Sequence, residues 1–343
     1  MWNQRISKTG RYLVKGDIGG LLVELRQFTA WQLRKRQAGL GSKVAPADEA
    51  TFWDEFDADL GRRVGWESAG DGCLGVWAFQ KMVKGANIHL SGLIADMITI
   101  SPAEPLHGLV LGCGDMTGEH AMFMDPALPF SEIDAYDISP KSIERARKLT
   151  ESNGLPVNYY VADLNQIELP ANKYALVIVF QSYHHFEQVD YIAQQINRAL
   201  LPGGVFYAND YIGPCKLQWS DDQLHYARQL LKLLPTHYRR GLNSEVRNHI
   251  DRVPPENFSP DEAICSDQIL PAIDSHLNVI YQYNWGGLLY PLLEGIAFNF
   301  TTSDEDMALL KLLFDLDYAL YQSGQIDPNF TITMATKRDQ SSL

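Results

Sequence analysis

The sequence predicts an α/β fold built on a doubly wound, Rossmann-like parallel sheet with helices on both faces. From His107 onward, short apolar runs alternate with helical stretches for roughly a hundred residues. Repeated strand–helix units of this kind indicate parallel strands that are joined by right-handed crossovers. The run Tyr174–Phe180 is apolar almost throughout, as expected of a strand that is covered on both faces.

Each expected element follows from a local pattern of apolar residues. The expected strands are short apolar or alternating runs: Leu109–Leu111, Ile133–Asp137, Val157–Val161, Tyr174–Phe180, Val205–Asn209, Asn278–Tyr283 and Phe330–Ala335. The expected helices have helical spacing and end signals: residues 16–36, Leu74–Thr99, Glu119–Met124, Pro140–Asn153, Asp190–Leu200, Trp219–Arg240 and Asp304–Gln322. Pro202-Gly203-Gly204 is expected to form a turn before the fifth strand.

Composition excludes several classes of protein. The 343 residues are 45% hydrophobic and 21% charged, which is typical of a globular protein. A net charge of −13 argues against wide contact with nucleic-acid phosphates. No secretory signal follows Met1, and no apolar stretch is long enough to span a bilayer. We therefore expect a cytoplasmic protein with reduced cysteines that binds neither nucleic acid nor membrane.

The turn after the first expected strand, Gly112–Asp115, is a candidate cofactor loop. Glycines let the backbone approach a ligand, and the following helix start offers free N–H groups to a carboxylate or phosphate. Either a dinucleotide or the amino-acid half of S-adenosylmethionine could bind there. A dinucleotide fingerprint needs a glycine at position 117, where this chain has Thr117. An NAD-dependent oxidoreductase on the same sheet is therefore kept only as the alternative.

Two acidic residues end the next strands. Asp137, roughly 20 residues past the glycine loop, lies where a carboxylate binds ribose hydroxyls in this type of sheet. Asp163 ends the third expected strand, where a carboxylate can accept a hydrogen bond from an adenine amino group, as is typical of methyltransferases. The fourth strand is followed by Gln181.

Four motifs in order now resemble one family. GCG at 112–114, YDIS at 136–139, ADL at 162–164 and LLPGG at 200–204 resemble the class I S-adenosylmethionine-dependent methyltransferases over roughly residues 105–212. Gln181–His185, Asp210–Pro214 and Gln218-Trp219 are similar to a bacterial subgroup of small-molecule methyltransferases. The resemblance implies a seven-stranded sheet of order 3-2-1-4-5-7-6 with the last strand antiparallel.

This resemblance also implies a division of the chain. Residues 106–343 would form the methyltransferase domain, with helical cap segments at about 213–275 and 286–328. Residues 1–105 would form an N-terminal helical extension. Its helix at residues 16–36 is expected to pack on this chain or, in a homodimer, on a second subunit.

The resemblance assigns S-adenosylmethionine as cofactor and implies how it binds. The loop Gly112–Asp115 would bind its methionine part, with Gly112, Cys113, Gly114 and Asp115 as the residues concerned. Asp137 and Ile138 would bind the ribose, while Ala162, Asp163 and Leu164 would contact the adenine. Gln181 would lie beside the sulfonium. The chain departs from the family motif at Val110, where an acid is usual, and at Met116, where a third glycine is usual.

His184 and His185 follow the fourth strand and are the candidate catalytic residues. Histidine can act as a base near neutral pH or position an acceptor; the alternative is that one imidazole caps or packs the following helix. Candidate walls of the acceptor pocket are Asp210, Tyr211, Trp219, Tyr283 and Trp285. A metal-assisted enzyme would need clustered carboxylates or amides at the ends of strands four and five. Because Gln181 and Asn209-Asp210 are insufficient, we expect no required metal.

The sequence therefore predicts a small-molecule methyltransferase. The expected reaction is O-methylation of a hydroxyl on a sugar or glycan precursor or on a natural product. A further alternative is a catalytically silent protein whose cap or N-terminal helix binds a partner.

Overall fold

The computed structural model of the chain describes residues 48–55, 65–100, 105–255 and 259–339. The expected helix at residues 16–36, and the homodimer contact proposed for it, lie outside these ranges. Among the described residues, no helix has both the length and the apolar composition needed to cross a bilayer.

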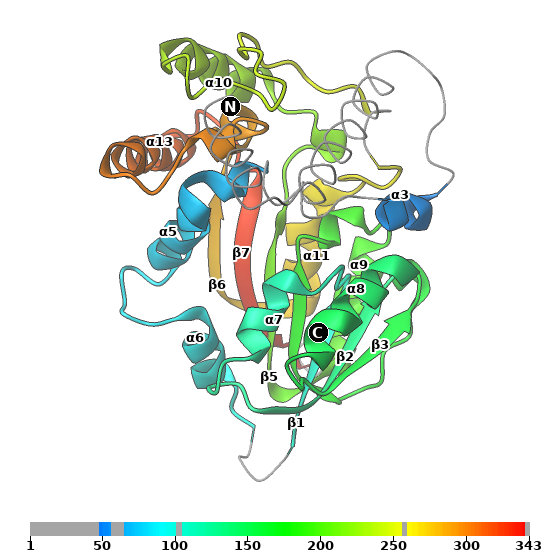
Figure 1. Cartoon of the computed structure of the whole chain (residues 1–343). Helices are drawn as coiled ribbons and strands as arrows, with labels where there is room; N and C mark the ends of the chain where they lie inside the picture. The colour runs from blue at the N-terminus through cyan, green and yellow to red at the C-terminus, as the bar shows by residue number, and fades with distance from the viewer. Residues whose placement is uncertain (1–47, 56–64, 101–104, 256–258, 340–343) are drawn as a thin grey trace, which may run out of the picture.

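One seven-stranded sheet forms the centre of the structure (Figure 1). Its strands are β1 (Leu106–Leu111), β2 (Phe130–Asp137), β3 (Val157–Val161), β4 (Tyr174–Phe180), β5 (Leu200–Tyr211), β6 (Leu277–Trp285) and β7 (Phe330–Lys337). Their order is β3-β2-β1-β4-β5-β7-β6, which confirms the predicted order. Strands β1 to β5 pair in parallel, and β7 is antiparallel to both neighbours. The carboxyl ends of five parallel strands therefore meet at one edge.

Helices cover both faces of this sheet because each turns an apolar side toward it. One face carries α5 (Cys73–Met82), α6 (Leu90–Met97), α7 (Thr117–Phe123) and α8 (Pro140–Glu151). The other face carries α9 (Val189–Ala199) and α11 (Ile269–His276). Strand β4 has its first six residues buried between these two layers, as its apolar run predicts. Ser139 caps α8, with Pro140 in its first turn, which fits their usual places at a helix start.

The expected helix Leu74–Thr99 is wrong as a single element. The structure breaks it into α5 and α6, because Lys84 and Gly85 adopt φ values of 54° and 75°, which a right-handed helix cannot contain. Residues Pro202–Gly204 also differ from expectation, since they lie within β5 and not in a turn before it. The β4–β5 pairing is irregular there, and Gly203 takes a φ of 83°.

A group of helices lies at the edge where the parallel strands end (Figure 1). It consists of η4 (Cys215–Leu217), α10 (Asp221–Leu233), α12 (Leu289–Leu293), η7 (Ala297–Asn299) and α13 (Asp304–Gln322). The short helices α3 (Glu49–Glu55) and η1 (Trp66–Gly72) reach the same edge from the N-terminal side. In contrast, α11 lies within the expected cap segment 213–275 but packs on α9 and β6 at a face of the sheet.

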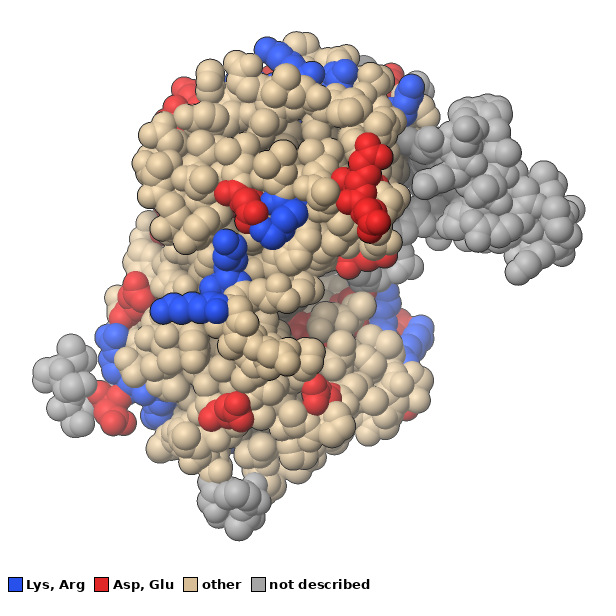
Figure 2. Space-filling model, turned by 90° about the vertical axis from the view of Figure 1, so that its left-hand side faces the viewer, with Lys and Arg blue, Asp and Glu red and all other residues tan. Residues whose placement is uncertain are grey.

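Figure 2 shows a surface that is hollowed at about mid-height. Basic side chains on this face form small groups beside acidic ones, and no continuous basic surface is visible among the described residues.

Candidate functional site

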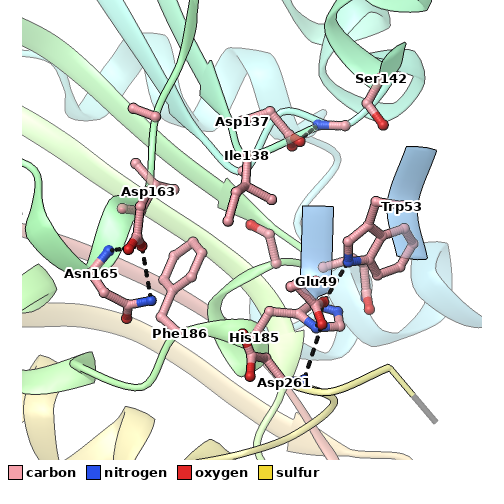
Figure 3. Close-up of a pocket in the computed structure, with 16 residues that line it drawn as sticks. Glu49, Trp53, Asp137, Ile138, Ser142, Asp163, Asn165, His185, Phe186 and Asp261 are labelled. Carbon is pink, nitrogen blue, oxygen red and sulfur yellow. Dashed lines mark hydrogen bonds and ion pairs between the residues drawn. The ribbon is translucent and has the colours of Figure 1, made fainter. Parts of the chain in front are cut away.

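A pocket opens at the carboxyl ends of β1 to β4 and encloses about 650 Å³, its open mouth included. This is within the range of small-molecule sites. Its lining consists of Glu49, Trp53, Gly112, Gly114, Asp137, Ile138, Ser142, Ala162, Asp163, Leu164, Asn165, Gln181, Ser182, His185, Phe186 and Asp261. All the predicted cofactor residues except Cys113 and Asp115 are therefore brought to one cavity. Figure 3 shows Asp163 and Asn165 on one side of it and Trp53, Glu49 and His185 on the other.

The glycine loop bends sharply after β1. Gly112, Gly114 and Met116 all have positive φ, at 71°, 50° and 62°. Methionine thus adopts the left-handed backbone at the position where the family usually has a third glycine. Cys113 is 3% exposed, and burial raises the pKa of its thiol well above the ordinary value. It therefore packs in the core beneath the loop and is not a reactive thiol.

Gly112 and Gly114 differ in the space around them. A Cβ at Gly112 would lie 2.5 Å from Ser182 Cβ, whereas a Cβ at Gly114 would meet no atom within 4 Å. We expect Gly112→Ala to lose about 2–4 kcal/mol of unfolding free energy, from overpacking and left-handed strain together. Gly114→Ala should lose only about 1–2 kcal/mol, from strain alone. Urea unfolding of both variants checks this, and equal losses would contradict the proposed close approach of Ser182.

Asp137 ends β2 at the pocket and is 8% exposed. Its Oδ2 accepts from the Gly114 N–H at 2.8 Å and its Oδ1 from the Ser139 N–H at 2.8 Å. Burial raises the pKa of Asp137, although these two hydrogen bonds oppose the rise. The carboxylate therefore ties the glycine loop to the start of α8, and each oxygen keeps a further lone pair for a ligand.

Asp163 follows β3 and has two places in the structure. It lines the pocket and also caps the short helix η2 (Leu164–Gln166). Its Oδ1 accepts from the N–H and side-chain amide of Asn165, at 2.9 and 3.1 Å (Figure 3). Ala162 and Leu164 also line the pocket.

Gln181 has a φ of 52°, which turns the chain at the end of β4. Its amide Nε2 lies 3.3 Å from Oε1 of Glu67 in η1. Burial, followed by repulsion from the carboxylates of Asp210 and Glu294, raises the pKa of Glu67 to about 7. An acid whose pKa lies near neutrality is therefore hydrogen-bonded to a residue that lines the pocket.

The two candidate histidines have different places. His185 lines the pocket, and its ring meets the Trp53 ring edge to face with centroids 5.1 Å apart. Its Nδ1 lies 3.1 Å from Glu49 Oε1. His184 is not among the lining residues and is 7% exposed.

The ring of His184 lies between two carboxylates. Its Nδ1 is 2.6 Å from Asp210 Oδ1, and its Nε2 is 3.6 Å from Glu262 Oε1. Burial lowers the pKa of His184, but the carboxylates, above all Asp210, outweigh burial and raise it overall.

Asp210, expected to wall the acceptor pocket, is completely buried at the end of β5. Its carboxylate accepts backbone N–H groups of Ser182, Tyr183, His184 and Tyr211 at 2.7–3.2 Å. It therefore holds the turn after β4 in place and faces that turn, not the pocket.

None of the other expected wall residues lines the pocket. Tyr211 and Trp219 are 2% and 3% exposed, and both rings contact Tyr290. Trp285 is buried in the same core, while Tyr283 stacks on Tyr318 beside α13. These aromatic side chains therefore pack in the core beneath the cap and do not form a wall of the pocket.

Sequence reasoning missed a set of residues at the site: Glu49, Trp53, Glu67, Ser142, Asn165, Ser182, Phe186 and Asp261. Ser142, Asn165, Ser182 and Phe186 lie within five residues of a motif and could have been included by proximity. Glu49, Trp53 and Glu67 come from a segment without a recognisable pattern. Only tertiary packing brings Glu49 and Trp53 into the pocket lining and Glu67 against Gln181.

Comparison with known proteins identifies the core. Residues 109–204 match a family described as a methyltransferase domain. A demethylmenaquinone methyltransferase of Thermus thermophilus is 24% identical over 107 residues, which are 31% of this chain and 49% of that protein. A ubiquinone biosynthesis O-methyltransferase of Methylocella silvestris is 24% identical over 185 residues, 51% of this chain and 67% of that protein. The matches thus span about half of the first relative and two thirds of the second.

A solved structure of a geranyl diphosphate C-methyltransferase from Streptomyces coelicolor A3(2) is 14% identical, with a TM-score of 0.44, and the match covers 86% of this chain and all of that one. The identification rests on the domain match, the four motifs and the sheet order. By these, residues 109–204 form a class I S-adenosylmethionine-dependent methyltransferase domain, and the cofactor of this class is S-adenosylmethionine.

Proposed function

We propose that this protein transfers the methyl group of S-adenosylmethionine to a hydroxyl oxygen of a small-molecule acceptor. The observation that carries the proposal is the hydrogen bond between Glu67 and Gln181. It joins an acid whose pKa is about 7 to the residue that is expected beside the sulfonium.

The cofactor is proposed to lie along the carboxyl ends of the strands. Its methionine part would contact Gly112 and Gly114, and its ribose would bind the free lone pairs of Asp137. The adenine would lie near Asp163 and Leu164. This assignment is supported by the single cavity that these residues share and by their match to the family motifs.

Glu67 is proposed as the general base. As the acceptor oxygen bonds to the methyl carbon, the carbon–sulfur bond breaks and its electron pair neutralises the sulfonium, giving S-adenosylhomocysteine. The hydroxyl proton passes to Glu67. A base with a pKa near the working pH is suited to this step, and alignment of acceptor and sulfonium supplies much of the remaining rate.

The proposal also specifies the class of acceptor. We propose that the methylated hydroxyl belongs to a sugar or glycan precursor or to a natural product. We further propose that the protein is cytoplasmic and that its domain division lies at about residue 105. The two curated relatives are named for menaquinone and ubiquinone synthesis, so phenolic hydroxyls belong in any acceptor panel.

Cofactor binding tests the proposal against its alternatives. Calorimetric titration should show saturable binding of S-adenosylhomocysteine and none of NADH. Asp137→Ala should weaken that binding at least about tenfold, because two hydrogen bonds between a ribose and a carboxylate contribute about 1.4 kcal/mol or more. The exposed Asp190→Ala is the matched control and should bind normally. Binding of NADH alone would indicate an oxidoreductase.

The same protein should form S-adenosylhomocysteine when it is supplied with S-adenosylmethionine and a panel of sugar, phenolic and aliphatic alcohols. Tight cofactor binding without transfer to any acceptor of the panel would favour the silent alternative.

A further inference from the structure

We infer that His184, His185 and Glu262 form a binding site for a first-row divalent transition metal. One ligand atom from each residue lies within 4.8 Å of the other two. Two imidazoles and one carboxylate suit Zn²⁺, Fe²⁺ or Co²⁺, whereas Mg²⁺ and Ca²⁺ prefer oxygen ligands. The residues at the ends of strands four and five predict no metal, but Glu262 lies outside them, in the segment before η6 (Ser266–Gln268).

The Nδ1 atom of each histidine lies close to a carboxylate. Nδ1 of His184 lies 2.6 Å from Asp210, and Nδ1 of His185 lies 3.1 Å from Glu49. An imidazole that donates its Nδ1–H to a carboxylate keeps the lone pair of Nε2 free. Carboxylates in this outer position are the usual partners of metal-bound histidine, because they fix the tautomer and the ring orientation.

The backbone around the site is held from several directions. Asp210 is completely buried and accepts the N–H groups of the turn that carries His184. The carbonyl of His184 accepts the N–H of Ile264 at 3.1 Å, which fixes the segment that carries Glu262. On the other side, Glu49 accepts the N–H of Asp261 at 3.0 Å. The ligands are therefore placed by the fold and do not depend on long flexible side chains.

The charges of the region favour a cation. Three carboxylates, those of Glu49, Asp210 and Glu262, lie within 4 Å of an imidazole nitrogen, and that of Asp261 interacts electrostatically with His185. Lys216 adds one positive charge nearby through its bond to the Pro260 carbonyl, which leaves the group negative. Because buried charges are costly without compensation, a dication would stabilise this arrangement.

The site adjoins the cofactor pocket, since His185, Glu49 and Asp261 all line it. Three protein ligands leave coordination positions open, and an oxygen of the acceptor could occupy one of them. Binding of the metal itself does not depend on the proposed methyl transfer, so the two can fail separately.

Zn²⁺ titration of the chelator-treated full chain tests the site. The background should carry Cys215→Ser and Cys265→Ser, which remove the two partly exposed thiols that could compete. We expect one equivalent of Zn²⁺ to bind, and Co²⁺ at the same site to give visible absorption bands. His184→Ala and Glu262→Gln should each weaken Zn²⁺ at least about tenfold, and Asp210→Asn by about 10–100-fold through the outer shell.

His276→Ala is the matched control, because His276 forms an exposed pair with Asp190 and neither residue lines the pocket; it should bind Zn²⁺ normally. Retained S-adenosylhomocysteine affinity in Glu262→Gln shows that this variant is folded. The inference is overturned if no stoichiometric Zn²⁺ binds, if binding survives both His184→Ala and Glu262→Gln, or if Mg²⁺ binds more tightly than Zn²⁺.

Discussion

Replacing Glu67 with glutamine is expected to lower kcat by about 10²–10⁴-fold, the usual contribution of a positioned general base. Glutamine keeps the shape and can still bond to Gln181, but it cannot accept the acceptor's proton. In the unmodified enzyme kcat should rise with pH and level off above about 7, because only the ionised carboxylate is a base and its pKa is about 7. In Glu67→Gln that inflection should disappear. Initial rates of S-adenosylhomocysteine formation across pH measure both effects.

The titratable groups around Glu67 determine whether the inflection in the pH profile of kcat can be assigned to Glu67. Asp210 and Glu294 are the charged neighbours that raise the pKa of Glu67 after burial. Tyr207 and Tyr290 also face it, and their own pKa values lie far above neutrality, so neither would produce an inflection near pH 7.

Two control measurements distinguish a loss of catalysis in Glu67→Gln from a loss of folding. S-adenosylhomocysteine affinity should change less than about threefold in Glu67→Gln, because this residue is expected to bind no part of the cofactor. Glu168→Gln, at an exposed glutamate paired with Arg198, should keep the kcat and the pH profile. A Glu67→Gln enzyme with unchanged kcat and an inflection still near pH 7 would rule out this base.

The part of the site that sequence could predict is the part made by single strand ends. Gly112, Asp137 and Asp163 each follow an apolar run, and parallel strands bring all their carboxyl ends to one edge. Knowing the sheet order is therefore enough to place them together, and the structure does so.

Glu67 could not be found in this way because its position depends on packing between distant segments. Its helix η1 is attached to the cap by the hydrogen bond from Gly70 to Phe300 and by the contact of Trp66 with Tyr290 of α12. Gly70 has a φ of 55°, and a Cβ there would meet two side chains at 2.9 Å. No period or motif in residues 42–75 signals such a contact.

The expected role of Asp210 failed for a different reason. A polar residue after a strand was assumed to face the ligand, but here the backbone N–H groups of the neighbouring turn needed an acceptor. An acid at a strand end can satisfy either requirement, and sequence alone does not tell which.

This role of Asp210 leads to a large expected loss of stability. In Asp210→Ala, four backbone N–H groups and the His184 ring lose their acceptor in a fully buried place. Removing one partner from a buried charged network typically costs about 3–5 kcal/mol, and we expect an unfolding free energy lower by that amount. Urea unfolding, followed by tryptophan fluorescence and circular dichroism, measures it.

Two further variants, Asp210→Asn and Asp190→Ala, make this prediction more specific. Both oxygens of Asp210 accept hydrogen bonds from N–H donors. In Asp210→Asn, the side-chain NH₂ group replaces one of these oxygens, so it would lie opposite an N–H group and could not accept its hydrogen bond. The loss of unfolding free energy in Asp210→Asn should therefore approach that in Asp210→Ala. A merely steric role would leave the stability of Asp210→Asn close to that of the natural protein.

Asp190→Ala breaks a pair with His276 in which the aspartate side chain is 74% exposed, and surface pairs of this kind contribute about 0–1 kcal/mol. If Asp210→Ala and Asp190→Ala lose similar amounts, the buried carboxylate is not what holds the turn after β4.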